Sequence, residues 1–401
     1  MITQAEADAL IDAACAPLST HSTALADANG TTLAEDVVAE RDSPPFDRVM
    51  MDGVAVRLRD GSREFIRQST QLAGDQAQTL RADAYAIEVM TGTPLPDGTD
   101  TVIPVERYTL NGERLRLDDD YQPQMGQFIH RRASDHDQGT IVLRRGQRIT
   151  APEIAIIASN GRPDVRVVRQ PSIAVIATGD ELVLPDRPVA AHQIRLSNAP
   201  AITALIQKAG FERVHWQHLP DAPETLQQHL AQLIESHDVI VLSGGVSKGR
   251  ADYVPAVLET IGVQQRFHRV AQKPGKPLWF GKAESGSLVF GLPGNPVSAL
   301  CCATRFVLPA LVKLGGALPA PVLNLPMASP YRFKPPLALM LPVSIKMTED
   351  GNATLMPQPT NTSGDFSSLA GTDGIATLPA GTTEFDAGDR VAFRPWSGAA
   401  F

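Results

Sequence analysis

The chain has 401 residues, which allows two to four domains at about 150 residues each. Hydrophobic residues make up 43% of it, enough to build real cores, so a disordered chain is excluded. A net charge of -8 and 5% aromatic residues argue against a nucleic-acid partner, because such surfaces need basic groups and base-stacking rings.

Periodicity changes twice within the first 170 residues. An amphipathic helix is predicted over residues 3–18, with Thr3 as its cap. Residues from about 41 to 140 lose helical periodicity and carry short apolar runs between Gly, Asp and Pro turns, which predicts a β-rich insertion. A second helix is predicted over 151–158, where Pro152 lies in the first turn and is tolerated.

Residues 171–316 alternate between buried strands and helices. Short apolar runs predict strands at 173–177, 238–242 and 288–290, and each run is closed by a turn rich in Gly or Pro. Helices are predicted near 198–209, 221–236, 252–261 and 296–314. This pattern is typical of an open α/β sheet, which binds ligands at the carboxyl ends of its strands. A Pro-rich link then leads to short strands and turns up to residue 401.

The three turns after these strands are the strongest candidates for a ligand site. They cover residues 178–181, 243–247 and 291–296. In the middle turn, Gly244 and Gly245 let backbone N–H groups approach an anion, and Ser243 and Ser247 add hydroxyl donors. A plain tight turn is an equally good interpretation of that turn alone.

Two further clusters carry charge beside these turns. Lys273 and Lys276 flank Pro274 and Gly275 on a stiff turn that suits a phosphate or carboxylate, although a solvated surface turn has the same composition. The carboxylates of Glu181 and Asp252 beside a phosphate site are suited to Mg²⁺. Helix capping is the alternative for Asp252.

Other sites and locations are disfavoured. Residues 245–249 match the G-x-S-x-G turn of hydrolases, but only His268 follows Ser247, so a serine hydrolase is improbable. The cysteines Cys15, Cys301 and Cys302 form no CxxC pair, which favours a reducing cytoplasm. We expect no signal peptide in the N-terminal sequence and no membrane span in the apolar stretch 296–322, which Arg305 and several Pro and Gly residues interrupt.

An ordered set of short motifs along nearly the whole chain resembles the MoeA/gephyrin-E family of molybdopterin molybdenumtransferases. Each motif is weak alone, and the ordered set is highly specific. The set comprises Pro44-Pro45-Phe46-Asp47, Met51-Asp52-Gly53, Met90-Thr91-Gly92-Thr93-Pro94, Thr178-Gly179-Asp180-Glu181, Ser197-Asn198, Ser243-Gly244-Gly245-Val246-Ser247, Asp252-Tyr253, Lys273-Pro274-Gly275-Lys276-Pro277 and Pro293-Gly294-Asn295-Pro296-Val297-Ser298.

The resemblance implies a multidomain α/β plus β architecture and an elongated homodimer. It implies a discontinuous linker-like domain from 1–40 and 141–170, a β-rich insertion at 41–140, a three-layer MogA-like α/β domain at 171–316 and a C-terminal β-barrel at 317–401. The implied reaction inserts molybdate into adenylylated molybdopterin and releases AMP in the presence of Mg²⁺. Implied partners are a molybdopterin adenylyltransferase and proteins that mature molybdoenzymes.

Matched positions inherit roles from this resemblance. The loops 243–247 and 293–298 would hold the pterin phosphate or the AMP portion, while Glu181 and Asp252 would bind Mg²⁺. The implied catalytic residues are Asp52, Thr91, Asp135, Glu181, Asp252, Lys273 and Lys276. The implied substrate-binding residues are Thr178, Gly179, Ser243, Gly244, Gly245, Ser247, Pro293, Gly294, Asn295, Pro296 and Ser298.

The chain departs from the family pattern at several acids. Ser134 stands where the family usually has an acid. Arg250, which follows the middle turn 243–247, also stands where the family usually has an acid. In addition, Arg48 stands where the family usually has Asn. A non-catalytic carrier or scaffold of the same family therefore stays open beside the transferase. A molybdopterin adenylyltransferase is the other alternative, but it would resemble only residues 171–316, so the resemblance along the full chain disfavours it.

Overall fold

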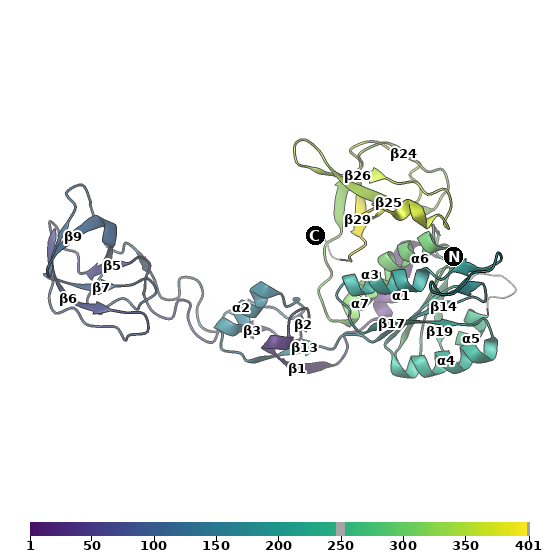
Figure 1. Cartoon of the computed structure of the whole chain (residues 1–401), viewed down its shortest axis with the longest axis horizontal. Coiled ribbons are helices and arrows are strands. Elements are labelled where there is room, and N and C mark those ends of the chain that lie inside the picture. Colours follow the sequence, from purple (N-terminus) through teal and green to yellow (C-terminus); the bar gives the residue numbers. More distant parts are fainter. Residues whose placement is uncertain (246–252, 399–401) are drawn as a thin grey trace. The chain divides into compact units, whose positions relative to one another are not determined.

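The computed structural model describes residues 1–245 and 253–398 of the chain (Figure 1). It divides into two compact units by contacts. The first unit contains Met1–Glu35, Gly146–Thr150 and Asp164–Phe401, and the second contains Asp36–Arg145 and Ala151–Pro163. Residues predicted to form the linker-like domain are shared between the two units, so the four-domain division stays a prediction.

The second unit is built on a six-stranded sheet, which confirms the β-rich insertion. Alternate residues of its strands enter two apolar clusters, so both faces are covered; Val54 and Val56 enter one cluster and Ala55 the other. The spatial strand order is β8 (Thr101–Pro104), β5 (Gly53–Val56), β7 (Tyr85–Val89), β6 (Glu64–Gln71), β10 (Arg114–Leu117) and β9 (Tyr108–Asn111).

Shorter elements complete the second unit. Strand β4 (Arg48–Val49) pairs with β11 (Ile129–His130), and β3 (Val37–Val38) pairs with β12 (Ile141–Leu143). The predicted second helix is present as α2 (Ala151–Ser159). These pairs bring segments about 80 to 100 positions apart together, which a sequence pattern cannot show.

The first unit begins with helix α1 (Gln4–Ala14), whose cap is the predicted Thr3. Thr3 and Glu6 form a reciprocal capping box. The helix ends four residues earlier than predicted, because Pro17 disfavours helical backbone at the preceding residue. A small antiparallel sheet follows, in the order β1 (Thr20–Ala24), β13 (Asp164–Val168) and β2 (Thr32–Leu33).

The α/β sheet of the first unit confirms the predicted strands and the three-layer arrangement. Its order is β17 (Val214–Leu219), β14 (Ile173–Thr178), β18 (Val239–Ser243), β22 (Leu288–Leu292), β21 (Trp279–Lys282) and β19 (Gln264–His268). The first four strands are parallel, whereas β21 and β19 are antiparallel additions. The carboxyl ends of the parallel strands therefore meet at one edge.

Helices cover both faces of this sheet (Figure 1). Helix α3 (Asn198–Lys208) packs with α1 and the 296–314 segment against one face. Helices α4 (Pro223–Ser236) and α5 (Val254–Thr260) cover the other face. Alternate residues of β14 divide between the two apolar clusters, as a sheet buried on both sides requires.

The predicted helix 296–314 has three parts. Helix α6 (Pro296–Cys302) continues through a π-helical turn (Ala303–Val307) into α7 (Leu308–Leu314). Pro309 lacks an N–H, so regular α-helical bonding fails one turn before it. Within the described residues this is the one helix whose length and apolarity would suffice to cross a membrane, and 78% of it is buried inside the protein, as in a core helix.

The C-terminal strands close into the predicted barrel. Strand β25 (Ala338–Met347) pairs on its two sides with β27 (Gly374–Leu378) and β26 (Ala353–Pro357). From β27 the path runs through β29 (Arg390–Pro395) to β23 (Leu323–Pro326). A bridge between Met327 and Leu355 then closes the ring onto β26.

One strand of the α/β segment joins this C-terminal sheet. Strand β20 (Gln272–Lys273) pairs in parallel with β25. The segment that carries Lys273 and Lys276 connects β19 to β21 of the α/β sheet, and it is hydrogen-bonded to the barrel through β20.

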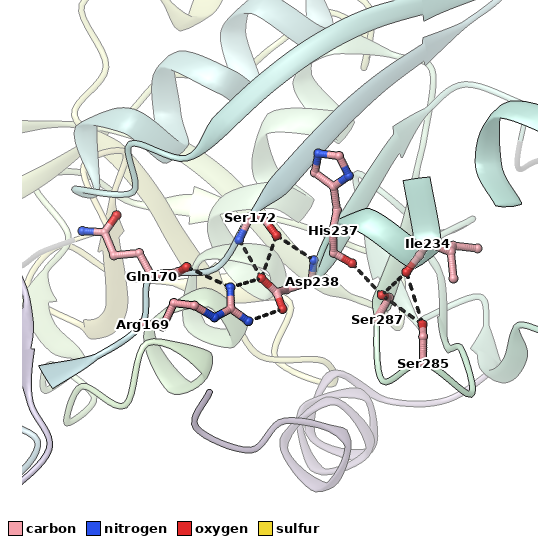
Figure 2. A network of polar contacts seen from close by, with 8 residues as sticks. All are labelled: Arg169, Gln170, Ser172, Ile234, His237, Asp238, Ser285 and Ser287. Atoms are coloured by element: carbon pink, nitrogen blue, oxygen red, sulfur yellow. Dashed lines mark hydrogen bonds and ion pairs between the residues drawn. The ribbon is translucent and has the colours of Figure 1, made fainter. Parts of the chain in front are cut away.

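A polar network holds the amino ends of the central strands, opposite to the ligand edge (Figure 2). The two terminal nitrogens of Arg169 each donate to Asp238 at 2.8 Å, and the Ser172 backbone and hydroxyl donate to the same carboxylate at 2.7 Å. Burial alone would raise the pKa of Asp238, but the hydrogen bonds from Arg169 and Ser172 outweigh it and lower that pKa to about 2. Nearby, the Ser287 hydroxyl contacts two helix-end carbonyls.

Candidate functional site

A cleft of about 670 Å³ lies at the carboxyl ends of the parallel strands in the first unit. Thr178 ends β14 and Ser243 ends β18, and Pro293 directly follows β22. Three separate turns thus supply its wall. Of the predicted site residues, the cleft is lined by Thr178, Glu181, Ser243, Gly244, Gly245, Pro293, Gly294, Asn295 and Pro296.

Close packing between these turns explains the two glycines of the middle turn. A Cβ on Gly244 would lie 2.5 Å from the Thr178 carbonyl oxygen, and one on Gly245 would lie 2.7 Å from Val254 Cγ2. Both glycines also have positive φ, at 107° and 65°. The Cα of Gly244 lies 3.8 Å from the position of a Gly294 Cβ. Bare backbone therefore faces the cleft from two turns at once.

Asn198 connects the two turns, a role that the sequence did not indicate. Its Nδ2 donates to the Ser243 hydroxyl at 2.9 Å and to the Gly294 carbonyl at 2.7 Å. From the first position of α3, this side chain fixes the spacing between the two turns.

Three further residues that line the cleft were not predicted from the sequence. Asp221 lines the cleft beyond the end of β17, and its place after a strand was an available signal. Arg195 and Phe366 also line it, and the side chain of Phe366 is 52% exposed although apolar. Phe366 comes from the C-terminal segment, so its approach to the cleft depends on tertiary structure alone.

A second cavity, of about 440 Å³, adjoins the first and shares Pro277, Pro293 and Asn295 with it. Lys273, Lys276 and Ser298 line this cavity together with residues of the barrel. Both lysines are exposed, and Lys273 Nζ lies 5.9 Å from the centre of the Phe333 ring. Ser298 is 3% exposed, so it contributes little surface to a ligand.

The acidic residues at the first cleft have different surroundings. The carboxylate of Glu181 lies over Gly179, where an added Cβ would be 2.8 Å from Glu181 Oε2, and Gly179 itself is not part of the lining. Asp180 instead accepts the backbone N–H of Asp221 at 3.1 Å and so connects the segments that follow β14 and β17. The predicted Ser247 and Asp252 lie outside the described residues. Among the described residues no three acidic, His or Cys side chains form a metal-binding group.

In the second unit, Asp52 and Thr91 contact one another directly. Asp52 Oδ1 accepts the Thr91 backbone N–H at 2.6 Å and its hydroxyl at 2.7 Å. The backbone bond first, and the hydroxyl bond second, lower the pKa of this exposed carboxyl. An ionised group is therefore held in a fixed direction at the surface of this unit.

Asp135 has its own set of partners. It accepts from His130 Nε2 at 2.9 Å and from the Ser43 hydroxyl at 3.4 Å. Arg48 Nη2 lies 3.0 Å from His130 Nδ1, so that nitrogen accepts and Nε2 carries the proton given to Asp135. Arg48, one of the departures from the family pattern, thus has a defined role here. The predicted site residues fall into two groups, one in each unit.

Three family profiles match successive parts of the chain. Residues 2–161 match the MoeA N-terminal region (domain I and II), residues 174–313 a probable molybdopterin binding domain, and residues 324–396 the MoeA C-terminal region (domain IV). Together these matches follow the order of motifs in the sequence.

Individual relatives agree with the profiles. The molybdopterin molybdenumtransferase of Synechocystis is 38% identical over 92% of this chain and 93% of its own length. The enzyme of that name from Haemophilus influenzae is 37% identical over 75% of this chain and 74% of its own. A crystal structure of a molybdopterin biosynthesis MoeA protein from Pyrococcus horikoshii OT3 has a TM-score of 0.83, 26% identity, and covers 98% of this chain and 100% of its own.

Proposed function

Because this chain belongs to the MoeA family of molybdopterin molybdenumtransferases, we propose that it inserts molybdate into adenylylated molybdopterin and releases AMP. The observation that carries the proposal is the pair of adjoining cavities in the first unit. One is lined by bare backbone turns suited to phosphates, and the other carries two exposed lysines suited to an oxyanion.

The two cavities share part of their wall, so their ligands can react with one another. Pro277, Pro293 and Asn295 line both, so a ligand in the first cleft and an anion beside Lys273 and Lys276 are neighbours. Water attacks the phosphoanhydride and AMP leaves. Molybdate then exchanges one oxo group for the two dithiolene sulfurs, and that oxygen leaves as water with the two thiol protons. Adjacent binding of both reactants reduces the entropic cost of bringing them together.

Each group of residues has a role in this proposal. The turns at 243–247 and 293–298 hold the phosphate or AMP portion, and Lys273 and Lys276 stabilise negative charge. Glu181 and Asp252 would hold Mg²⁺, which supplies charge neutralisation at the phosphoanhydride. The carboxylate of Glu181 in the cleft fits such a hard cation, since carboxylate oxygens are its preferred ligands.

The second unit contributes Asp52, Thr91 and Asp135 to the proposed reaction. In the homodimer that the family resemblance implies, these residues complete the cleft of the partner subunit. The fixed Asp52–Thr91 contact supports a positioning role, because two hydrogen bonds hold the carboxylate ionised in one direction.

The test is an assay of AMP release and of active cofactor formed by the purified chain with adenylylated molybdopterin, Mg²⁺ and molybdate. We expect both products to depend on molybdate. We expect Asp52→Ala and Glu181→Ala each to abolish turnover while the dimer survives in gel filtration, because each removes an anionic group from the site. Unchanged turnover in both variants would refute the site assignment.

A carrier or scaffold is the alternative proposal, favoured by Ser134 and Arg250 at positions that usually hold acids. In the same assay, tight binding of adenylylated molybdopterin without AMP release would support it. Loss of all binding would reject both proposals.

A further inference from the structure

Two glutamine side chains are buried beneath the turn that carries Lys273 and Lys276. Gln272 is 1% exposed and Gln4, on the first turn of α1, is 9% exposed. Gln4 Nε2 donates to Gln272 Oε1 at 2.9 Å, and Gln272 Nε2 donates to the Gly275 carbonyl at 2.9 Å. The amides therefore form a directed chain that ends on the glycine between the two lysines.

The turn leaves no room for a side chain at position 275. A Cβ at this glycine would lie 2.3 Å from Cys302 Sγ and 3.2 Å from Gln272 Nε2, and its φ is 89°. The turn is also closed by the Val270 N–H, which donates to the Lys276 carbonyl at 3.0 Å. Its backbone is thus packed on the buried face while the lysines remain exposed on the other.

The N-terminal segment clamps the same turn from its base. The Ile2 N–H donates to the Arg269 carbonyl at 3.1 Å, and the Ala271 N–H donates to the Ile2 carbonyl at 2.7 Å. Strand β20 also pairs with β25 of the barrel. Gln272 consequently lies where the N-terminal segment, the lysine turn and the barrel meet.

Two buried amides are not needed to fill this space. Buried amides carry a desolvation cost unless they are hydrogen-bonded, and apolar side chains of similar size would fill the space without it. What the amides add is direction, since Gln272 fixes the carbonyl between the two lysines. This bond holds the backbone between the two lysines.

We propose that Gln272, oriented by Gln4, is a positioning residue that sets the affinity of the lysine turn for its anion. This inference rests on the proposed function, which supplies molybdate as the anion to test. Neither glutamine touches the anion itself. Both act through the backbone of Gly275, so their loss lowers anion affinity without removing a charge.

The test compares Gln272→Met, Gln4→Met and the double variant with the full-length wild type. Met matches Gln in length and lacks the amide. We expect Gln272→Met to raise KM for molybdate about 10- to 100-fold, the range typical of small misplacements of a binding group. KM for adenylylated molybdopterin and kcat at saturating molybdate stay near wild type. Gln4→Met has a smaller effect, because the bond to Gly275 survives.

The double variant separates positioning from stability. Removing both amides leaves neither one unpaired, so thermal stability should recover relative to Gln272→Met, while the molybdate KM stays raised. Ser287→Ala serves as a matched control, because it removes a buried hydroxyl at the amino end of β22, outside the sheet that contains Gln272. It should lower the Tm and leave KM for molybdate unchanged.

Calorimetric titration with molybdate gives a readout that does not need turnover. If the wild type binds molybdate but releases no AMP, the proposed function fails, and weaker binding by Gln272→Met still supports the positioning role. A rise confined to KM for adenylylated molybdopterin would overturn it, because the affinity for molybdate would then be unaffected. Wild-type values of both constants in Gln272→Met, a recovered KM in the double variant, or no molybdate binding by the wild type would each overturn it.

Discussion

Replacing Asp238 by Asn removes a charge from the network at the amino ends of the central strands and changes little else in volume. Asn can still accept the Ser172 N–H through its carbonyl oxygen. It cannot accept both nitrogens of Arg169, which now donate to the two carboxylate oxygens at 2.8 Å each. The variant therefore leaves a partly buried guanidinium without its anionic partner.

The size of the effect follows from the pKa. A fall from the ordinary 3.8 to about 2 in the folded state corresponds to about 2.5 kcal/mol at 1.36 kcal/mol per unit, as an upper value. The Arg169 side chain is 33% exposed and that of Asp238 is 19% exposed, so solvent screens part of the interaction. We expect Asp238→Asn to lower the free energy of unfolding at pH 7 by about 1–2 kcal/mol.

The pH dependence has a definite sign. Because folding lowers the pKa of Asp238, its contribution is complete above about pH 4 and is lost as pH falls through about 2. The stability difference between wild type and variant should therefore be constant from pH 7 to 5. It should shrink as pH falls below 4.

Urea unfolding followed by tryptophan fluorescence suits this measurement, because Trp216, Trp279 and Trp396 all lie in the first unit. The signal then reports that unit without the second. Arg169→Met with Asp238→Asn is the matched control, since it removes both charges and should recover part of the loss. A loss below about 0.5 kcal/mol at pH 7, or a difference that does not change with pH, would refute the reasoning.

Two further substitutions test local structure, one in each unit. Gly53→Ala should destabilise the second unit by about 2–4 kcal/mol, because the new Cβ would lie 2.0 Å from the Ile103 carbonyl oxygen. Amide hydrogen exchange in that unit would report the loss of stability. Unchanged protection would contradict the close approach. Thr3→Ala should cost about 1 kcal/mol of first-unit stability in urea unfolding, because the capping box with Glu6 is lost, whereas Thr3→Ser should keep it.

Local sequence determined much of the α/β domain. The strands after residues 172, 238 and 287 were predictable because short Val-, Ile- and Leu-rich runs closed by Gly or Pro have few alternatives. The N-terminal cap at Thr3 was predictable for the same reason, since Ser/Thr followed by Glu three positions later fixes a helix start. Parallel strands then require their carboxyl ends to share an edge, so the grouping of the 178, 243 and 293 turns followed.

The family resemblance supplied what these patterns could not. Asp52, Thr91 and Asp135 lie in a β-rich segment where turn chemistry explains each of them equally well. The structure shows Asp52 bonded to Thr91 and Asp135 bonded to His130, which are pairings across 39 and 5 positions. Their part in catalysis stays a prediction.

Tertiary structure alone decided the connections between segments. Asn198 joins the turns at Ser243 and Gly294, Phe366 reaches the cleft from the barrel segment, and Gln4 reaches Gln272 across 268 positions. None of these side chains follows a periodic pattern. A polar residue that satisfies a distant partner looks like any surface residue in the sequence, and an exposed Phe gives no sign of the cleft that it lines. Periodicity records which face of an element is buried, whereas the partner it meets is set only when the layers pack.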